Sequence, residues 1–331
     1  MTPEPQWPLV SVNILAYNRR DMVRQTLQKT LDELDYPRDR LEIIVVDNES
    51  SDGTKEMLAD EFPDVKVVVI EKNMGVPAWN KGFEAGSGDY FLVLDDDCFI
   101  VGDSLKLAVS GAQEENADLV SFLVLNGYDH SMVFNSLAST GILEFWGCSA
   151  LISARAIKQV GGFDPNIKFL SHELEFSMRF FDAGFKHLFL PEVHSYHMKP
   201  LLPHLKRWHT LLHGSPIDKI LRVQRNRLGY IAGKSLQPRD GRAALWHMTL
   251  KTLLASYRWP RLLLGLPGMV AGFRLGRQNH APVRPEISRI YSKNFLEFAN
   301  PLSYAGVPRN RRRFFRLNRR FYPGQKATLQ L

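Results

Sequence analysis

Three consecutive aspartates, Asp95, Asp96 and Asp97, are the residues of this chain most clearly suited to chemistry. They directly follow five apolar residues, a run typical of a strand buried on both faces of a parallel sheet. Ligands bind at the carboxyl ends of such strands. Carboxylates crowded there repel one another, and burial increases that cost unless a cation is present. The triplet therefore predicts a Mg2+ or Mn2+ site able to hold a phosphate, with an acidic turn facing water as the alternative.

The elements that must position these acids follow from the apolar pattern. Four predicted strands alternate with helical segments, and they span residues 10–16, 41–46, 65–70 and 90–94. This order predicts a doubly wound, mostly parallel α/β sheet. Asn18 is predicted to cap the first helix with Asp21 three residues on. Neither a G-x-G-x-x-G loop nor a P-loop lysine follows the first strand, which counts against a dinucleotide dehydrogenase or a P-loop phosphotransferase.

The charge of the chain divides unevenly between its two halves. The 331 residues carry a net charge of +7, but residues 201–331 hold 25 Lys and Arg against 4 Asp and Glu. Residues 1–200 are correspondingly acidic, with 17 basic and 31 acidic side chains. Such asymmetry indicates an acidic catalytic half joined to a basic half that faces nucleic acid or an anionic membrane.

Cysteine use and apolar segments bear on where the protein works. The two cysteines, Cys98 and Cys148, provide no disulfide framework and suit a reducing cytoplasm. The polar, proline-rich start, 1–8, is not expected to be a signal peptide. The apolar segment 262–273 is broken by glycine and proline and is shorter than the roughly 20 residues that cross a bilayer.

Several motifs occur in an order that resembles the family 2 glycosyltransferases of the GT-A fold. The resemblance covers roughly residues 9 to 200. Within the family, the chain is similar to the bacterial rhamnosyltransferase type. The motifs are Ser11–Arg19, Val45–Thr54, Asn73-x-Gly75 with Asn80-x-Gly82, Gly88-Asp89-Tyr90 leading to the aspartates, Gly161-Gly162-Phe163-Asp164, and the helix start from Glu173 to Arg179.

The resemblance implies how a nucleotide-sugar donor would be bound. Asp47 would accept a hydrogen bond from the nucleobase, with Asn48 beside it, and a carboxylate suits the imide N–H of uracil or thymine. A turn-forming Asp47 is the alternative interpretation. By the same resemblance, Asn73, Asn80 and Lys81 would lie on a segment that lines the donor site.

The resemblance also assigns the metal ligands. Asp95 and Asp97 form a D-x-D pair that would hold the ion, while Asp96 between them would face sugar or ribose. A short strand is expected over 186–190, and His197 beyond it has the spacing of a further metal ligand, with His194 as second choice.

The general base of an inverting transfer is the remaining role that the resemblance implies. Glu173 stands where the family commonly has an aspartate, and His172 is a candidate to share its work. A carboxylate there would take the proton of the acceptor hydroxyl. The alternative is that Glu173 and Glu175 are first-turn acids favoured by the helix dipole.

These inferences predict a catalytic domain over 9–200, a helical membrane-surface or acceptor region over 201–280, and a basic tail over 281–331. The leading hypothesis is an inverting, metal-dependent glycosyltransferase that moves a sugar from a UDP- or dTDP-type donor. The acceptor would be a hydroxyl of a lipid-linked or cell-surface glycan, and the enzyme would be peripheral at the inner face of the cell membrane. A nucleic-acid partner is disfavoured. The alternatives are a basic nucleic-acid-binding protein on an α/β scaffold and a sugar nucleotidyltransferase.

Overall fold

The computed structural model describes residues 7–130, 145, 147–198, 216–256 and 260–298. Two compact units divide the chain. Among the described residues, the first unit comprises those from 7 to 168 and from 183 to 198, and the second comprises those from 169 to 182 and from 216 to 298. Residues 169–182 thus belong to the second unit although they lie within the resemblance to the glycosyltransferases. The basic tail beyond 298 lies outside the described residues.

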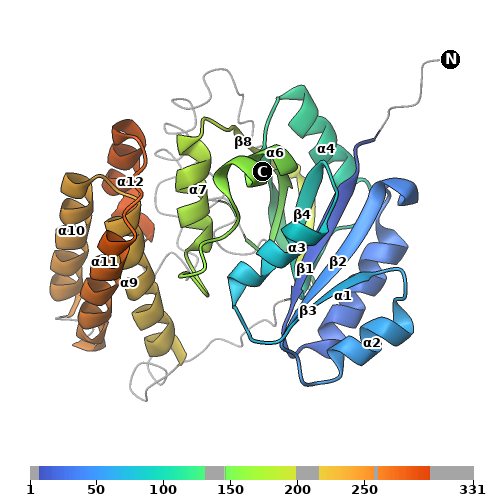
Figure 1. Ribbon diagram of the computed structural model, residues 1–331, viewed down its shortest axis with the longest axis horizontal. Coiled ribbons are helices and arrows are strands. Elements are labelled where there is room, and N and C mark those ends of the chain that lie inside the picture. The colour runs from blue at the N-terminus through green and yellow to red at the C-terminus, as the bar shows by residue number, and fades with distance from the viewer. Residues whose placement is uncertain (1–6, 131–144, 146, 199–215, 257–259, 299–331) are drawn as a thin grey trace. The chain divides into compact units, whose positions relative to one another are not determined.

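The first unit is built on a mixed sheet of eight strands in the order β3-β2-β1-β4-β7-β6-β8-β5 (Figure 1). Strands β1 to β4 are parallel to one another, as predicted. β7 is antiparallel to both β4 and β6, and β5 is antiparallel to β8. The strands are β1 Val10–Ala16, β2 Leu41–Asn48, β3 Lys66–Ile70, β4 Tyr90–Asp95, β5 Cys98–Phe99, β6 Leu119–Asn126, β7 Ser149–Ser153 and β8 His187–His197.

Helices pack on the sheet of the first unit, whose central strands are buried over most of their length. Val12 and Ile14 of β1 are fully buried, and Leu27 of α1 packs in the same core. The doubly wound, mostly parallel α/β fold of the prediction is therefore confirmed. The helical segments are α1 Arg20–Glu33, η1 Arg38–Arg40, α2 Thr54–Glu61, η2 Val76–Ala78, α3 Trp79–Ala85, α4 Ser104–Glu114 and α6 Ala154–Val160.

Two local predictions are wrong. Asn18 does not cap α1: it has a φ of +51°, and its Oδ1 accepts a hydrogen bond from the backbone N–H of Ser51 at 2.7 Å. The side chain thus ties the end of β1 to the loop after β2. The strand expected over 186–190 is present, but its predicted length is wrong, because β8 runs from His187 to His197.

A bulge explains how β8 extends so far. Leu190 pairs with Phe122 of β6, whereas the next β6 residue, Leu123, pairs with His194. Three residues of β8, beginning with Pro191, are thus extra, and proline has no N–H to donate to the ladder. The shift brings His197, rather than His194, opposite Asn126.

The second unit is helical in the described residues. Its helices α9 and α11 approach closely along matched glycines, so that a Cβ on Gly229 would lie 2.1 Å from the Met269 carbonyl oxygen. A Cβ on Gly272 would lie 2.1 Å from the Asn226 carbonyl oxygen. Among the described helices, none is long and apolar enough to cross a membrane. The segments are α7 His172–Asp182, α9 Pro216–Lys234, α10 Pro238–Ser256, η3 Pro260–Gly265, α11 Leu266–Gln278 and α12 Pro285–Phe298.

Candidate functional site

The three aspartates lie where β4 turns into β5, and backbone contacts from three elements fix this turn. The Asp95 N–H donates to the carbonyl of Cys148 at 3.2 Å, and the Met198 N–H donates to the carbonyl of Asp97 at 2.7 Å. The hydroxyl of Thr26 on α1 donates to the Asp96 carbonyl at 2.7 Å. The acids are therefore held by the sheet and by α1 rather than by a mobile loop.

His197 joins this acidic turn through the sheet. β5 pairs with β8 so that Cys98 lies opposite His197, and the imidazole Nε2 is 3.1 Å from Oδ1 of Asp97. One potential ligand atom from each of Asp95, Asp97, Cys98 and His197 lies within 4.8 Å of all the others. The three predicted metal ligands thus share one cluster, and His194 is not among the cluster's residues within the described part of the chain.

Arg19 contacts the acidic turn, and the sequence analysis did not identify it as a site residue. It follows β1 at the carboxyl edge of the sheet, and its Nη1 contacts Oδ1 of Asp96 at 2.9 Å and Oδ2 of Asp97 at 2.7 Å. Its side chain is 53% exposed, so it covers the acids from the solvent side. The only signal for Arg19 in the sequence was its place at the end of the Ser11–Arg19 motif, because its contact with Asp96 joins residues 77 positions apart.

The two aspartates that Arg19 contacts have opposite pKa shifts. Burial raises the pKa of Asp96 to about 6, and the charge of Asp97 adds to this, although Arg19 opposes it. Burial also acts to raise the pKa of Asp97, but hydrogen bonding and charge attraction from His197 and Arg19 outweigh it and lower that pKa. Asp97 is therefore the more readily ionised of the two aspartates, whereas ionisation of Asp96 costs free energy.

The chemistry of the donor atoms fits a hard divalent cation. Carboxylate oxygens of Asp95 and Asp97 with one imidazole form a ligand set suited to Mg2+ or Mn2+. Cys98 is close by, but burial, together with the neighbouring Cys148, raises its pKa well above the ordinary value. A protonated thiol is a poor ligand for such an ion.

The predicted nucleobase residue, Asp47, ends β2 beside Asn48, and each is 2% exposed. Oδ1 of Asp47 accepts a hydrogen bond from the Ser50 N–H at 3.1 Å, which is the turn-forming arrangement. Its other carboxylate oxygen is not used in that turn. Asp47 pairs with Ala16 in the ladder, so its β2 terminus lies next to the end of β1.

Asn48 and Asn73 hold the segment after β3 in place. The Asn48 Oδ1 accepts from the Met74 N–H at 2.9 Å, and its Nδ2 donates to Oδ1 of Asn73 at 3.2 Å. Gly75 follows with a φ of +71°, and a Cβ there would lie 2.3 Å from the Lys168 carbonyl oxygen. Only glycine fits, and the segment is thereby fixed against the Asp164–Lys168 region.

Asn80 and Lys81 have different environments. The Asn80 amide accepts from the Phe163 N–H and donates to the Phe163 carbonyl, both at 2.8 Å. It thereby anchors the Gly-Gly-Phe-Asp motif. Lys81 forms a surface ion pair with Glu84 at 2.6 Å. The structure places neither side chain in the acidic cluster.

The predicted base, Glu173, lies in the first turn of α7 in the second unit. Oε2 of Glu173 is 3.1 Å from Nδ1 of His172, and burial lowers the pKa of that histidine. Glu175 has a different role: it is fully buried and forms ion pairs of 2.7 Å with both Arg179 and Lys234. Glu175 is thus structural, whereas the Glu173 side chain is 19% exposed.

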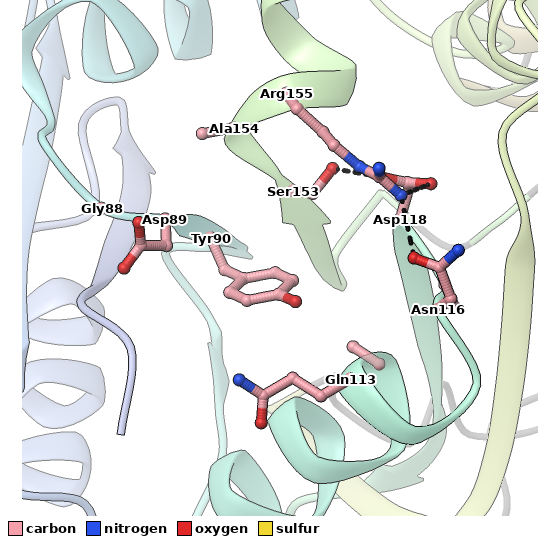
Figure 2. Close-up of a pocket in the computed structure, with 11 residues that line it drawn as sticks. Gly88, Asp89, Tyr90, Gln113, Asn116, Asp118, Ser153, Ala154 and Arg155 are labelled. Carbon is pink, nitrogen blue, oxygen red and sulfur yellow. Dashed lines mark hydrogen bonds and ion pairs between the residues drawn. The ribbon is translucent and has the colours of Figure 1, made fainter. Parts of the chain in front are cut away.

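A pocket of about 500 Å³ opens at the opposite end of β4, where the strand begins (Figure 2). Its charged centre is the buried Asp118, which accepts from the Ser153 hydroxyl at 2.7 Å and pairs with Arg155. Because these groups satisfy one another, the pocket carries no catalytic arrangement. Its lining comprises Gly88, Asp89, Tyr90, Ala112, Gln113, Asn116, Ala117, Asp118, Ser153, Ala154 and Arg155.

Family models match most of the described chain. The model for glycosyl transferase family 2 matches residues 11–140, and that for glycosyl transferase family group 2 matches residues 90–275. The chain is 28% identical over 228 residues to the probable glycosyltransferase YdaM of Bacillus subtilis, covering 59% of this chain and 54% of that protein. It is 27% identical over 201 residues to glycosyltransferase AglE of Haloferax volcanii, covering 56% of this chain and 66% of that protein. The chain thus spans about half to two thirds of these relatives.

Two solved structures share the fold across almost the whole chain. The mannosyltransferase PcManGT of Pyrobaculum calidifontis, in complex with GDP-Man and Mn2+, superposes with a TM-score of 0.53 at 17% identity, covering 97% of this chain and 89% of that one. Residues 1–349 of TarS of Staphylococcus aureus superpose with a TM-score of 0.55 at 16% identity, covering 96% and 93%.

Proposed function

This chain belongs to the family 2 glycosyltransferases, and from that premise we propose that it is an inverting enzyme with a nucleotide-sugar donor, preferentially of the UDP or dTDP type. The observation that carries the proposal is the cluster of Asp95, Asp97 and His197 at the carboxyl end of β4. Two aspartates with an imidazole, at the strand ends of a ligand-binding edge, suit a cation that also binds a diphosphate. The Mn2+ and GDP-Man bound to the mannosyltransferase of the same fold support this proposal.

The ligands in this proposal are Asp95, Asp97 and His197, holding Mg2+ or Mn2+. The bound ion would neutralise the negative charge that develops on the departing nucleoside diphosphate. Arg19 adds a fixed positive charge beside Asp96 and Asp97 and so opposes the rise in pKa that burial causes in both acids. Asp96, between the two ligands, would contact the sugar or ribose.

Asp47 recognises the nucleobase in this proposal, and the segment after β3 positions it. A buried carboxylate at the end of β2 offers an oxygen acceptor to an imide N–H, which uracil and thymine carry. Asn48 accepts a hydrogen bond from the Met74 N–H and donates one to Asn73, and these bonds order the wall of the proposed base site before the donor arrives. Such order lowers the entropic cost of binding.

Glu173 is the proposed general base, which takes the proton of the acceptor hydroxyl as the sugar is transferred. Its carboxylate is 19% exposed and lies 3.1 Å from Nδ1 of His172, so it is available to an acceptor. Glu175, only two residues further on, is committed to Arg179 and Lys234.

The outward face of α10 supports action at an anionic membrane surface. Trp246 is 65% exposed and Leu254 is 70% exposed, and the exposed Arg242 and Lys251 lie on the same helix. Large apolar side chains interspersed with cations are typical of a helix that lies in a lipid interface. We therefore propose a lipid-linked or cell-surface glycan as acceptor, and relatives such as TarS, a poly(ribitol-phosphate) β-N-acetylglucosaminyltransferase, support a role in cell-wall or polysaccharide synthesis.

The test is release of nucleoside diphosphate from a panel of nucleotide sugars, with membranes as the source of acceptor. We expect release with a UDP or dTDP sugar in the presence of Mn2+ or Mg2+, and none after chelation. Turnover that is unaffected by thorough chelation contradicts the proposal, as does hydrolysis of a nucleoside triphosphate to pyrophosphate.

A further inference from the structure

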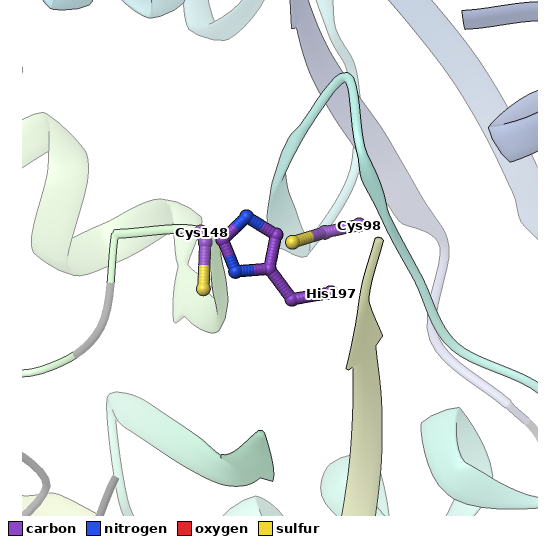
Figure 3. Close-up of side chains that lie close together, drawn as sticks. All are labelled: Cys98, Cys148 and His197. Carbon is purple, nitrogen blue, oxygen red and sulfur yellow. The ribbon is translucent and has the colours of Figure 1, made fainter. Parts of the chain in front are cut away.

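The two cysteines of the chain provide a second set of ligand atoms beside the acidic cluster. One ligand atom each from Cys98, Cys148 and His197 lies within 4.8 Å of the others. Figure 3 shows the His197 ring between the two cysteine side chains. The three residues come from β5, from the segment just before β7, and from the end of β8. Neither cysteine is in a disulfide.

We propose that Cys98, Cys148 and His197 form a binding site for a thiophilic divalent cation of the Zn2+ type. The site is distinct from the carboxylate site for the hard cation, and the two sites share His197. Thiolate sulfur and imidazole nitrogen are the ligands that Zn2+ prefers, whereas Mg2+ and Mn2+ prefer carboxylate oxygen. The imidazole of His197 thus belongs to both ligand sets, one for a hard cation and one for a thiophilic cation.

The spacing of the ligand atoms suits such an ion. Zn–S bonds of about 2.3 Å in a tetrahedron place two sulfurs roughly 3.8 Å apart. The atoms lie within 4.8 Å of one another, so closing around the ion requires movement of about 1 Å, within reach of side-chain rotation. Oδ1 of Asp97, 3.1 Å from Nε2 of His197 and 3.9 Å from Sγ of Cys98, borders the site but is not grouped with Cys148, so the fourth position of the tetrahedron is left to water.

The surroundings favour retention of the ion once it is bound. Cys98 is fully buried and Cys148 is 7% exposed, and both are held by sheet hydrogen bonds rather than by a loose loop. Binding of M2+ converts the two thiols into thiolates and releases two protons. The two thiolate charges then cancel the charge of the ion, so that no net charge is added to the buried site. Access is from the side of Asp97 and His197, whose side chains are 13% and 16% exposed.

The shared imidazole has a consequence that depends on the proposed function. If His197 also binds the Mn2+ that holds the donor, a thiophilic ion on the cysteines removes that ligand and competes with donor binding. Zn2+ is then expected to inhibit the Mn2+-supported reaction, and the inhibition is expected to require Cys148.

The direct test uses Co2+ as a spectroscopic probe on the reduced full-length protein. Thiolate bound to Co2+ gives an intense near-ultraviolet charge-transfer band, which carboxylate ligands do not give. We expect the wild-type protein to develop this band at one equivalent of Co2+ and to lose it when Zn2+ is added. Cys148→Ser and Cys98→Ser are expected to lose the band, while His194→Gln, a histidine of the same strand outside the cluster, keeps it.

The outcomes separate this inference from the proposed function. Absence of the band in the wild-type protein overturns the site whatever the variants do, and so does a band that persists unchanged in a folded Cys148→Ser. Circular dichroism checks the fold of each variant, and Cys148→Ser carries the comparison if Cys98→Ser does not fold. Loss of Mn2+-dependent turnover with every donor would refute the proposed function and leave the Co2+ band unaffected.

Discussion

Replacement of Asp96 by asparagine should stabilise the metal-free protein at neutral pH. The side chain of Asp96 is 10% exposed, and burial raises its pKa from 3.8 to about 6. An acid whose pKa is higher in the folded state binds more protons when folded, so ionisation of Asp96 destabilises the fold as the pH rises from about 4 to about 6. The shift corresponds to about 3 kcal/mol at pH 8, with the opposing effect of Arg19 already included.

Urea unfolding in EDTA measures this effect. We expect Asp96→Asn to exceed the wild type in free energy of unfolding by about 3 kcal/mol at pH 8. The difference should shrink through pH 5 and vanish near pH 3, where the wild-type carboxyl is protonated in both states. Saturating Mn2+ should narrow the difference at pH 8, because a nearby cation lowers the pKa of Asp96.

Two results would refute this reasoning. Equal stability of the two proteins at pH 8 in EDTA would mean that Asp96 is not desolvated. A variant that is less stable than the wild type at pH 8 would mean that the contact with Arg19 outweighs burial and the repulsion from Asp97.

The remaining predictions concern the cluster, the base, the anchor of the motif and the membrane face. Asp97→Asn should fold normally but lose about 10²- to 10³-fold or more in turnover and lose Mn2+-dependent donor binding by calorimetry, and full activity would contradict its role as a ligand. Glu173→Gln should keep donor binding and lose transfer by about 10²- to 10⁴-fold, with the exposed Glu56→Gln as control, and normal transfer would place the base elsewhere. Asn80→Ala should cost roughly 1–3 kcal/mol in urea unfolding because two partly buried hydrogen bonds to Phe163 are lost, whereas Lys81→Ala on the same helix should cost about 1 kcal/mol or less. Trp246→Ser should weaken binding to vesicles with anionic lipid about tenfold, and unchanged sedimentation with those vesicles would reject the interfacial role of α10.

Local patterns in the sequence were sufficient to predict the first half of the sheet. β1 to β4 are apolar runs separated by helices, and the parallel order fixes which strand ends meet at one edge. The carboxylates of Asp95 and Asp97 could therefore be placed at that edge without a structure. Asp47 could be placed at the same edge for the same reason.

The features that the sequence did not reveal depend on register and on distant pairing. His197 was predicted ahead of His194 on the family resemblance alone. The physical reason is a bulge at Pro191 that adds three residues to β8, and no local pattern in the sequence indicates it. The contact of Arg19 with Asp96 joins residues 77 positions apart. The turn at Asn18 was misassigned because its side chain bonds to Ser51 across the sheet edge instead of to its own helix.

The central claim is that a divalent cation at the end of β4 holds the donor diphosphate. Crystals grown with Mn2+ and a nucleoside diphosphate, measured at the manganese absorption edge, test it most directly. The account predicts one anomalous peak among Asp95, Asp97 and His197, bridged to the diphosphate. A diphosphate bound at this edge with no anomalous peak beside it, or with the manganese bound elsewhere on the protein, would contradict the account.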